Sequence, residues 1–389
     1  MQTLLFVLGF VLFVGLILIH EWGHFITARR NGVEVEEFGL GIPPRAWSKK
    51  LKSGMLLSLN WLPLGGFVKL KGEHDNDHRP GSFGAASLLA KTKIMLAGVG
   101  MNLIAGLILL TIVALVGMPK LIDNQFGLAS DTKIVHRQVL VGYIEPGSPA
   151  QTAGLSGRDV IKLVSANGQT RTIATVQELH KTTTDFAGQI VGLTITHNGR
   201  EQVKTVTLRS AREVEPTKKT DHPKGYLGIS PTELQTYRAT WSAPIVALGF
   251  TKQLVVLTMQ GLAHALSGLG STIAGTLSGN RQARVNGQTE ATAQVGGPVA
   301  IGAFLWDSGS LGFNFMLFVI AYISLALALM NILPLPALDG GRLLMVLVSR
   351  SILGRPLGQK IEERLVGASM VLLLSLFIII TIVDVKRFF

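Results

Sequence analysis

The sequence contains no cysteine, and only 15% of its 389 residues are charged. The lack of cysteine excludes a disulfide scaffold and a thiolate metal site, so any metal ion would need His, Asp or Glu ligands. Soluble domains carry charge on roughly a quarter of their residues. The low charged fraction, together with a mean hydropathy of +0.41, excludes an ordinary soluble enzyme and a disordered chain. The composition is typical of a membrane protein.

Acidic residues are also scarce, with 24 Asp and Glu against 36 Lys and Arg. A net charge of +12 is compatible with nucleic-acid binding, but the basic residues lie in loops beside apolar runs and form no single stripe. We therefore expect no nucleic-acid partner. The simpler use of these charges is to orient the chain in a lipid bilayer.

Long apolar runs occur at 4–19, 94–118, 313–333 and 365–383. They predict four transmembrane helices, within the segments 1–30, 93–118, 311–348 and 362–385, because a bilayer core needs roughly 20 helical residues. The first run is short, so its helix must continue through residues 20–27 to span. A secretory signal peptide is the alternative there, but no Lys or Arg precedes the run and no small-residue cleavage site follows it.

Charge predicts the orientation. Between residues 25 and 93 there are 11 basic residues against six acidic ones. The positive-inside rule therefore places the loop 31–92 in the cytoplasm and the N-terminus outside.

A fifth apolar segment, 244–269, carries Lys252, Gln253, Gln260 and His264, which suits an amphipathic helix at the interface as well as a span. A crossing here would carry the end of the third span to the face opposite His20 and His24. We therefore assign 240–310 to an extracytoplasmic, interfacial region.

The chemistry is concentrated in His20-Glu21-Trp22-Gly23-His24, an H-E-x-x-H motif at the end of the first run. Residues four apart share one helix face, so His20 and His24 can bind one ion while Glu21 holds a water beside it. Zinc is the expected metal. The alternative, two His residues snorkelling to the interface, leaves unexplained why an unneeded Glu21 extends a membrane helix, where ionisable groups are costly.

A third ligand should lie at the same depth. Asp339 is the only acid near the third span, and Pro334 and Pro336 must interrupt regular helix before it. Irregular backbone at membrane depth is tolerated where it is buried in protein or lines water. Asp339 as the N-cap of a following helix is an alternative reading that is compatible with ligation.

These residues carry a family resemblance. The H-E-x-x-H motif and the Asn331-x-x-Pro334-x-Pro336-x-Leu338-Asp339-Gly340 motif resemble those of the site-2 protease family of intramembrane zinc metalloproteases. The segments 63–69 (PLGGFVK) and 296–301 (GGPVAI) agree with it, and the chain looks most like the bacterial RseP-type (regulator of sigma-E) proteases. It departs from many of them in having room for a single PDZ domain. Some members have Asn at the position of Ala326, and relatives often have Pro at the position of Val99.

The resemblance implies a function. Zn²⁺ is held by His20, His24 and Asp339, with Glu21 as the general base. Asn331 hydrogen-bonds the substrate backbone, and a membrane-associated β-hairpin at about 54–71 pairs with the substrate through its central residues. Those residues are Gly65, Gly66, Phe67 and Val68. The substrates are single-span membrane proteins, such as anti-sigma factors or remnant signal peptides, in the bacterial inner (cytoplasmic) membrane. An ordinary cytoplasmic hairpin is the alternative for 54–71.

Residues 125–230 predict a small α+β domain. Strands are indicated at 139–144, 160–164, 191–197 and 201–208, and Ser148 precedes a short helix that Gly154 ends. The pattern resembles a PDZ domain whose carboxylate-binding loop, Tyr226-Leu227-Gly228-Ile229, follows the other strands, as in a circularly permuted form. Such a domain binds extended peptide C-termini by strand addition. A spacer that shields the active site by bulk is the alternative.

Together these features predict a multi-pass α-helical membrane protein with four transmembrane helices, a cytoplasmic β-hairpin and an extracytoplasmic α+β PDZ domain. The function predicted is an intramembrane zinc endopeptidase. A catalytically silent PDZ-bearing scaffold would have no use for Glu21, and an ion or zinc transporter would need polar residues along several spans.

Overall fold

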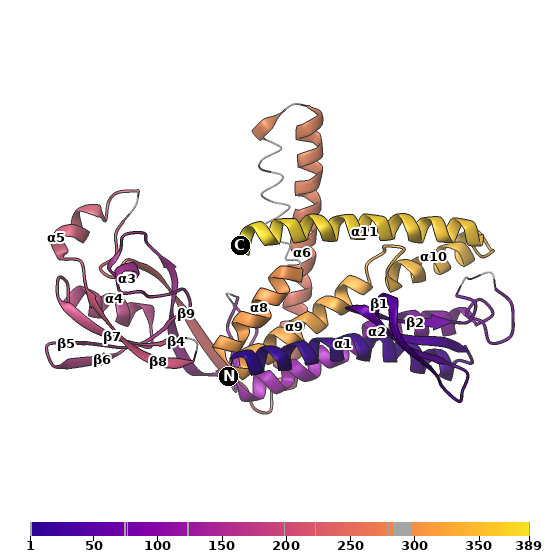
Figure 1. Ribbon diagram of the computed structural model, residues 1–389, viewed down its shortest axis with the longest axis horizontal. Coiled ribbons are helices and arrows are strands. Elements are labelled where there is room, and N and C mark those ends of the chain that lie inside the picture. Colours follow the sequence, from indigo (N-terminus) through magenta and orange to yellow (C-terminus); the bar gives the residue numbers. More distant parts are fainter. Residues whose placement is uncertain are drawn as a thin grey trace. The chain divides into compact units, whose positions relative to one another are not determined.

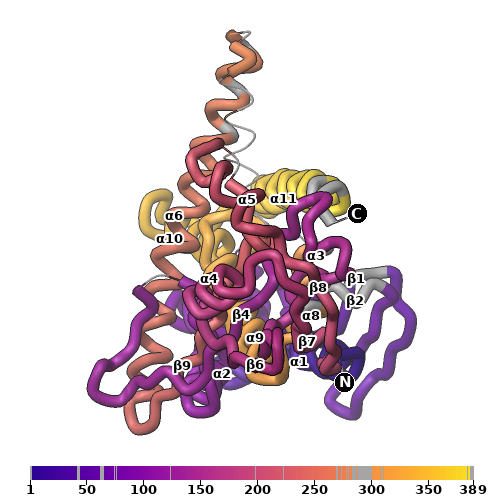
Figure 2. The backbone as a smooth tube through the Cα atoms, turned by 90° about the vertical axis from the view of Figure 1, so that its left-hand side faces the viewer, coloured from indigo at the N-terminus to yellow at the C-terminus, as the bar shows by residue number. Residues whose placement is uncertain are grey.

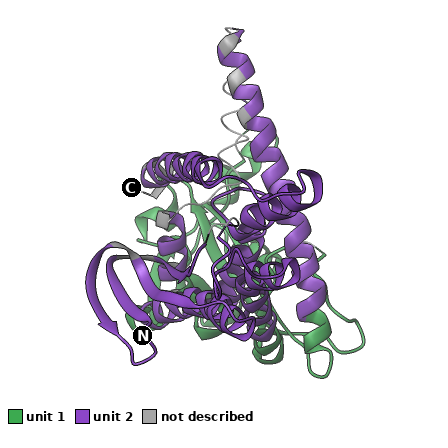
Figure 3. Cartoon of the chain, turned by 90° about the vertical axis from the view of Figure 1, so that its right-hand side faces the viewer, with its two compact units in different colours: residues 1–5, 111–246, 308–315 green, residues 6–110, 247–307, 316–389 purple. Residues whose placement is uncertain are grey.

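The computed structural model describes residues 2–73, 75, 77–122, 124–197, 199–221, 223–278, 280–282, 286 and 298–388 (Figure 1). The chain divides into two compact units, distinguished by colour in Figure 3. The strand-rich unit comprises residues 1–5, 111–246 and 308–315, and the helical unit comprises residues 6–110, 247–307 and 316–389.

Long helices dominate the chain. They are α1 (Gln2–Arg30), α2 (Leu88–Val116), α6 (Ala243–Leu277), α8 (Pro298–Leu311), α9 (Phe313–Asn331), α10 (Asp339–Ile352) and α11 (Gln359–Phe388). Within the described residues, five helices are long and apolar enough to cross a membrane, namely α1, α2, α6, α9 and α11. These helices make the chain a membrane protein. Because α6 is the segment assigned above to the interface, the four-span layout stays a prediction.

Helices α2 and α9 of the helical unit pack closely. A Cβ on Gly106 of α2 would lie only 2.6 Å from the Leu325 side chain of α9, so the absent side chain lets these helices approach. The buried Ser324 hydroxyl of α9 donates a 2.7 Å hydrogen bond to the Asn102 carbonyl of α2. Helix α2 therefore packs against α9 through Asn102 and Gly106, which lie four residues apart.

A two-stranded antiparallel sheet of β1 (Val35–Lys50) and β2 (Leu56–Leu70) lies between α1 and α2 in the sequence. The expected hairpin over 54–71 differs from what is observed, because both of its halves pair with β1: residues 37–40 are in register with 66–69 and also with 56–59. The sequence analysis missed β1 because it contains Gly39, Gly41, Pro43 and Pro44, residue types that are depleted in strands.

The strand-rich unit contains one sheet with the order β3-β9-β4-β5-β7-β8, and β6 pairs with β5. Figure 2 traces the backbone of this unit and labels β4, β6, β7, β8 and β9. Its strands are β3 (Met118–Pro119), β4 (Lys133–Ile144), β5 (Val160–Ala166), β6 (Gln169–Thr172), β7 (Ile190–His197), β8 (Arg200–Thr207) and β9 (Ile229–Arg238). The short helices are α3 (Pro149–Thr152), α4 (Val176–Asp185), α5 (Ala211–Val214) and the 3-10 turn η1 (Glu215–Thr217).

The strand predictions for this unit are confirmed, and Ser148 is the N-cap of α3, where its side chain accepts from the Gln151 backbone N–H. Strand β9, which directly follows the loop 226–228, pairs with β4, the first long strand of the unit. Apolar side chains from β4, β5, β7 and α4 form the core, including Val141, Val164, Leu179 and Leu193. Assignment of this unit as a PDZ domain stays a prediction.

Candidate metal centre

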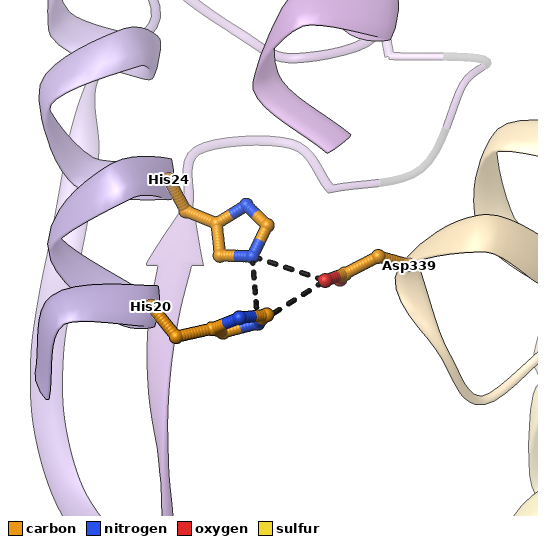
Figure 4. Close-up of side chains that lie close together, drawn as sticks. All are labelled: His20, His24 and Asp339. Carbon is orange, nitrogen blue, oxygen red and sulfur yellow. Dashed lines mark hydrogen bonds and ion pairs between the residues drawn. The ribbon is translucent and has the colours of Figure 1, made fainter. Parts of the chain in front are cut away.

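His20 and His24 lie on one face of α1, which continues as unbroken helix to Arg30. Their side chains are only about a tenth exposed, and the Asp339 side chain is 20% exposed. The two Nε2 atoms are 3.2 Å apart. Asp339 Oδ2 lies 3.2 Å from Nε2 of His20 and 3.1 Å from Nε2 of His24 (Figure 4). The structure thus brings Asp339 to two histidines that lie more than 300 positions earlier in the sequence.

Asp339 reaches this position through a tight turn. Helix α9 ends at Asn331, and α10 begins at Asp339 after the N-cap residue Leu338 in extended conformation, so Asp339 itself is not the N-cap. A Cβ on Gly340 would collide with the Ile332 carbonyl, and one on Gly341 with the Leu335 carbonyl. The two glycines therefore let the proline-containing turn fold back on the first turn of α10, which directs the carboxylate at the imidazoles.

Helix α2 supports both imidazoles. The Nδ1 atom of His24 is 2.8 Å from the Ile94 carbonyl oxygen, which can only accept, so Nδ1 carries the proton and Nε2 keeps its lone pair. Gly98 lies one helical turn further on, and a Cβ there would be 2.7 Å from Nε2 of His20 and closer still to Nε2 of His24. The two imidazole rings therefore fit against α2 only because residue 98 has no side chain.

The three ligand atoms suit a zinc ion. Each pair is 3.1–3.2 Å apart. Ligand atoms about 2.0–2.1 Å from a tetrahedral zinc ion are separated from one another by about 3.3 Å. Two imidazole nitrogens and one carboxylate oxygen leave one position open, as in catalytic zinc sites. Within the described residues, these three form the only group of His and acidic residues placed to hold a metal ion.

Glu21 lies beside this group and is 9% exposed. Strand β2 passes directly over it: a Cβ on Gly66 would be 2.8 Å from Glu21 Cγ and 3.3 Å from the Ile17 side chain of α1. Gly66 therefore lies against the H-E-x-x-H helix at the Glu21 side chain, a contact that sequence reasoning could not locate.

Comparison with known proteins identifies the chain. The model of "Peptidase family M50" matches residues 8–376, nearly the whole length. The chain belongs to peptidase family M50. The expected site-2 protease membership is confirmed, and with it the assignment as an intramembrane protease, a peptide-bond hydrolase.

Curated relatives of this M50 peptidase match it over most of their length. A protein of Clostridium acetobutylicum named "Putative zinc metalloprotease" is 30% identical over 97% of this chain and 96% of its own. A Clostridium perfringens protein with the same type of name is 28% identical over 96% of both chains. The "Zinc metalloprotease Rip1" of Mycobacterium bovis is 28% identical over 89% of this chain and 87% of its own.

The other predicted residues of the M50 peptidase lie on different elements from the metal ligands. Asn331 is half-buried at the last residue of α9, and Phe67 and Val68 lie in β2 beyond Gly66. The segment 226–229 belongs to the strand-rich unit, where the Glu145 N–H donates to the Gly228 carbonyl at 3.0 Å. Sequence reasoning did not assign Ile94, Gly98 or Asn102 to this site.

Proposed function

We propose that this peptidase binds Zn²⁺ through His20, His24 and Asp339 and cleaves transmembrane segments of single-span membrane proteins. The observation that supports it best is the triangle of ligand atoms, whose sides of 3.1–3.2 Å match a tetrahedral zinc site. When bound, zinc acts as a Lewis acid toward the scissile carbonyl and lowers the pKa of a water molecule toward neutrality.

Glu21 is the general base in this proposal. It directly follows the ligand His20 on α1, it is 9% exposed, and the neighbouring β2 strand covers its side chain at Gly66. It takes the proton of the attacking water and passes it to the leaving amine. A scaffold protein would have no use for this buried carboxylate, because it neither packs as an apolar group nor anchors a helix.

Substrate binding is assigned to β2. A peptide bond in a membrane helix is already hydrogen-bonded, so the helix must unwind before water can attack. Residues 66–69 pair with 37–40 of β1 on one side. Strand addition at their other edge would replace the hydrogen bonds that unwinding removes, and the contact of Gly66 with Glu21 would bring the added strand past the general base. Asn331 is proposed to hydrogen-bond the same substrate backbone.

The remaining assignments follow the charge pattern and the family resemblance. We place the enzyme in the bacterial inner membrane, with four spans, an outside N-terminus and an active site toward the cytoplasm. The strand-rich unit is then extracytoplasmic, and as a single PDZ domain it filters substrates or takes peptide C-termini at 226–229. The substrates are anti-sigma-factor-like proteins or remnant signal peptides.

The test compares purified wild type with Glu21→Gln and Asp339→Asn on a model single-span substrate, with zinc content measured for each. We expect Glu21→Gln to retain zinc and lose at least about 100-fold in cleavage rate, because general-base catalysis typically contributes this much. Asp339→Asn should lower zinc occupancy. Equal cleavage by wild type and Glu21→Gln would remove the general base, and unchanged zinc in Asp339→Asn would refute ligation.

A further inference from the structure

Helix α2 presents three residues, each one turn apart, to the two imidazoles of the metal centre. The Ile94 carbonyl faces His24, and Gly98 makes room for both rings. Asn102, which is 1% exposed, places its amide nitrogen 3.3 Å from Nδ1 of His20. The oxygen of the same side-chain amide, Asn102 Oδ1, is buried, and among the described residues it has no hydrogen-bond partner.

A histidine that binds metal through Nε2 needs its proton on Nδ1, because a neutral imidazole carries only one N–H. The carbonyl of Ile94 meets this need for His24. Donation from the Asn102 amide nitrogen would do the opposite for His20. It would put the ring proton on Nε2, the atom that lies 3.2 Å from Asp339, and an Nε2–H cannot bind a metal ion.

The two ends of an Asn amide are nearly identical in shape, and the hydrogen-bond network decides which atom faces which partner. Turning the Asn102 amide by a half rotation brings the orphaned Oδ1 to Nδ1 of His20. The buried oxygen then gains a donor, which matters because an unsatisfied buried polar atom costs about 1–3 kcal/mol. The same rotation leaves the lone pair of His20 Nε2 directed at the metal centre.

We propose that Asn102 is a positioning residue that accepts a hydrogen bond from Nδ1–H of His20 through Oδ1 and so selects the metal-binding tautomer. The inference rests on the proposed function, in which His20 binds zinc. The fully buried Ser324 of α9 donates a 2.7 Å hydrogen bond to the backbone carbonyl of Asn102, so it contacts this residue without touching the side-chain amide. Helix α2 then serves both histidines in the same way, from residues two helical turns apart.

The test measures zinc affinity by competition with a chelator for Asn102→Asp and Asn102→Leu in the full-length, detergent-solubilised protein. Asp keeps an acceptor at the position of Oδ1, whereas Leu has a similar size and no acceptor. We expect Leu to weaken zinc binding 10–100-fold, as losses of such supporting groups do, and Asp to stay within about threefold of wild type. The absorption spectrum of the cobalt-substituted protein should likewise shift in the Leu variant alone.

Ser324→Ala is the matched control, because it removes a hydrogen bond to Asn102 without touching the amide, and it should bind zinc as wild type does. Zinc binding that is unchanged in Asn102→Leu, or equally weakened in Asn102→Asp, overturns the inference. If Asn102→Leu does not fold, the smaller Asn102→Ala provides the same comparison. The His20→Ala variant distinguishes failure of this inference from failure of the proposed function. Zinc affinity that does not depend on His20 refutes the proposed function itself.

Discussion

Replacing Gly98 by Ala adds one methyl group where α2 faces the metal centre. A Cβ at this position would lie 2.6 Å from Cε1 and 2.7 Å from Nε2 of His20, and closer to Nε2 of His24. Neither imidazole can turn aside freely, since Ile94 and Asn102 hold their Nδ1 atoms and α1 carries both rings on one face. The methyl group must therefore displace the ligand atoms themselves.

The size of the effect follows from these distances. Ordinary van der Waals contact begins at 3.4 Å, so the rings must retreat by at least about 0.7 Å, whereas zinc–ligand distances tolerate about 0.2 Å. Since loss of a single supporting group weakens metal binding 10–100-fold, shifting two ligands together should weaken it by at least about 100-fold, or about 2.7 kcal/mol. In an exposed helix, Gly→Ala would instead stabilise by about 1 kcal/mol.

Gly100→Ala is the matched control. It lies two residues further along the same helix, and a Cβ there meets nothing within 4 Å. Zinc affinity by chelator competition and cleavage of a single-span substrate are measured for both variants beside wild type. We expect Gly98→Ala to lose both properties and Gly100→Ala to keep both. If Gly98→Ala binds zinc within about threefold of wild type, the rings are not confined as described and the reasoning fails.

Three further predictions test the surroundings of the site. Gly66→Ala should displace the Glu21 side chain and lower kcat in steady-state kinetics, while the zinc content stays unchanged. Asp75→Asn should cost about 3–5 kcal/mol in chemical denaturation, because it leaves the buried Lys91 ammonium unpaired; a loss below about 1 kcal/mol would contradict this. Hydrogen bonds from Ser242 and Thr240 lower the pKa of Asp131. The ionised carboxylate therefore stabilises the fold fully at neutral pH, and this stabilisation is lost as the pH falls through the depressed pKa. Asp131→Asn should remove this contribution to the acid dependence of thermal unfolding.

Local periodicity explains which features could be predicted from the sequence. The four-residue spacing of His20 and His24 determines their shared face on any helix, and the apolar runs determine where α1, α2, α9 and α11 form. The turn residues in the strand-rich unit likewise predicted its strands, because turn chemistry is local. Asp339 could be chosen as the third ligand by elimination, as the one acid near the end of its span, and through the family motif that contains it.

The β1–β2 sheet and the α6 segment show where prediction failed or stopped. Strand β1 depends on pairing with both halves of β2, a contact between distant residues that its own Gly and Pro content argues against. Helix α6 carries both apolar and polar residues, so its composition alone does not choose between a span and an interfacial helix.

The amino-acid sequence alone determined the kind of chemistry in this protein, since the ligand types and the general base lie in two short motifs. Only the tertiary structure decided how those motifs work together. The proton on His24 depends on the Ile94 carbonyl, the room for both rings depends on Gly98, and the cover over Glu21 depends on Gly66. Each of these depends on how one element is rotated against another, and that rotation is determined by packing over the whole helical unit rather than by neighbouring residues.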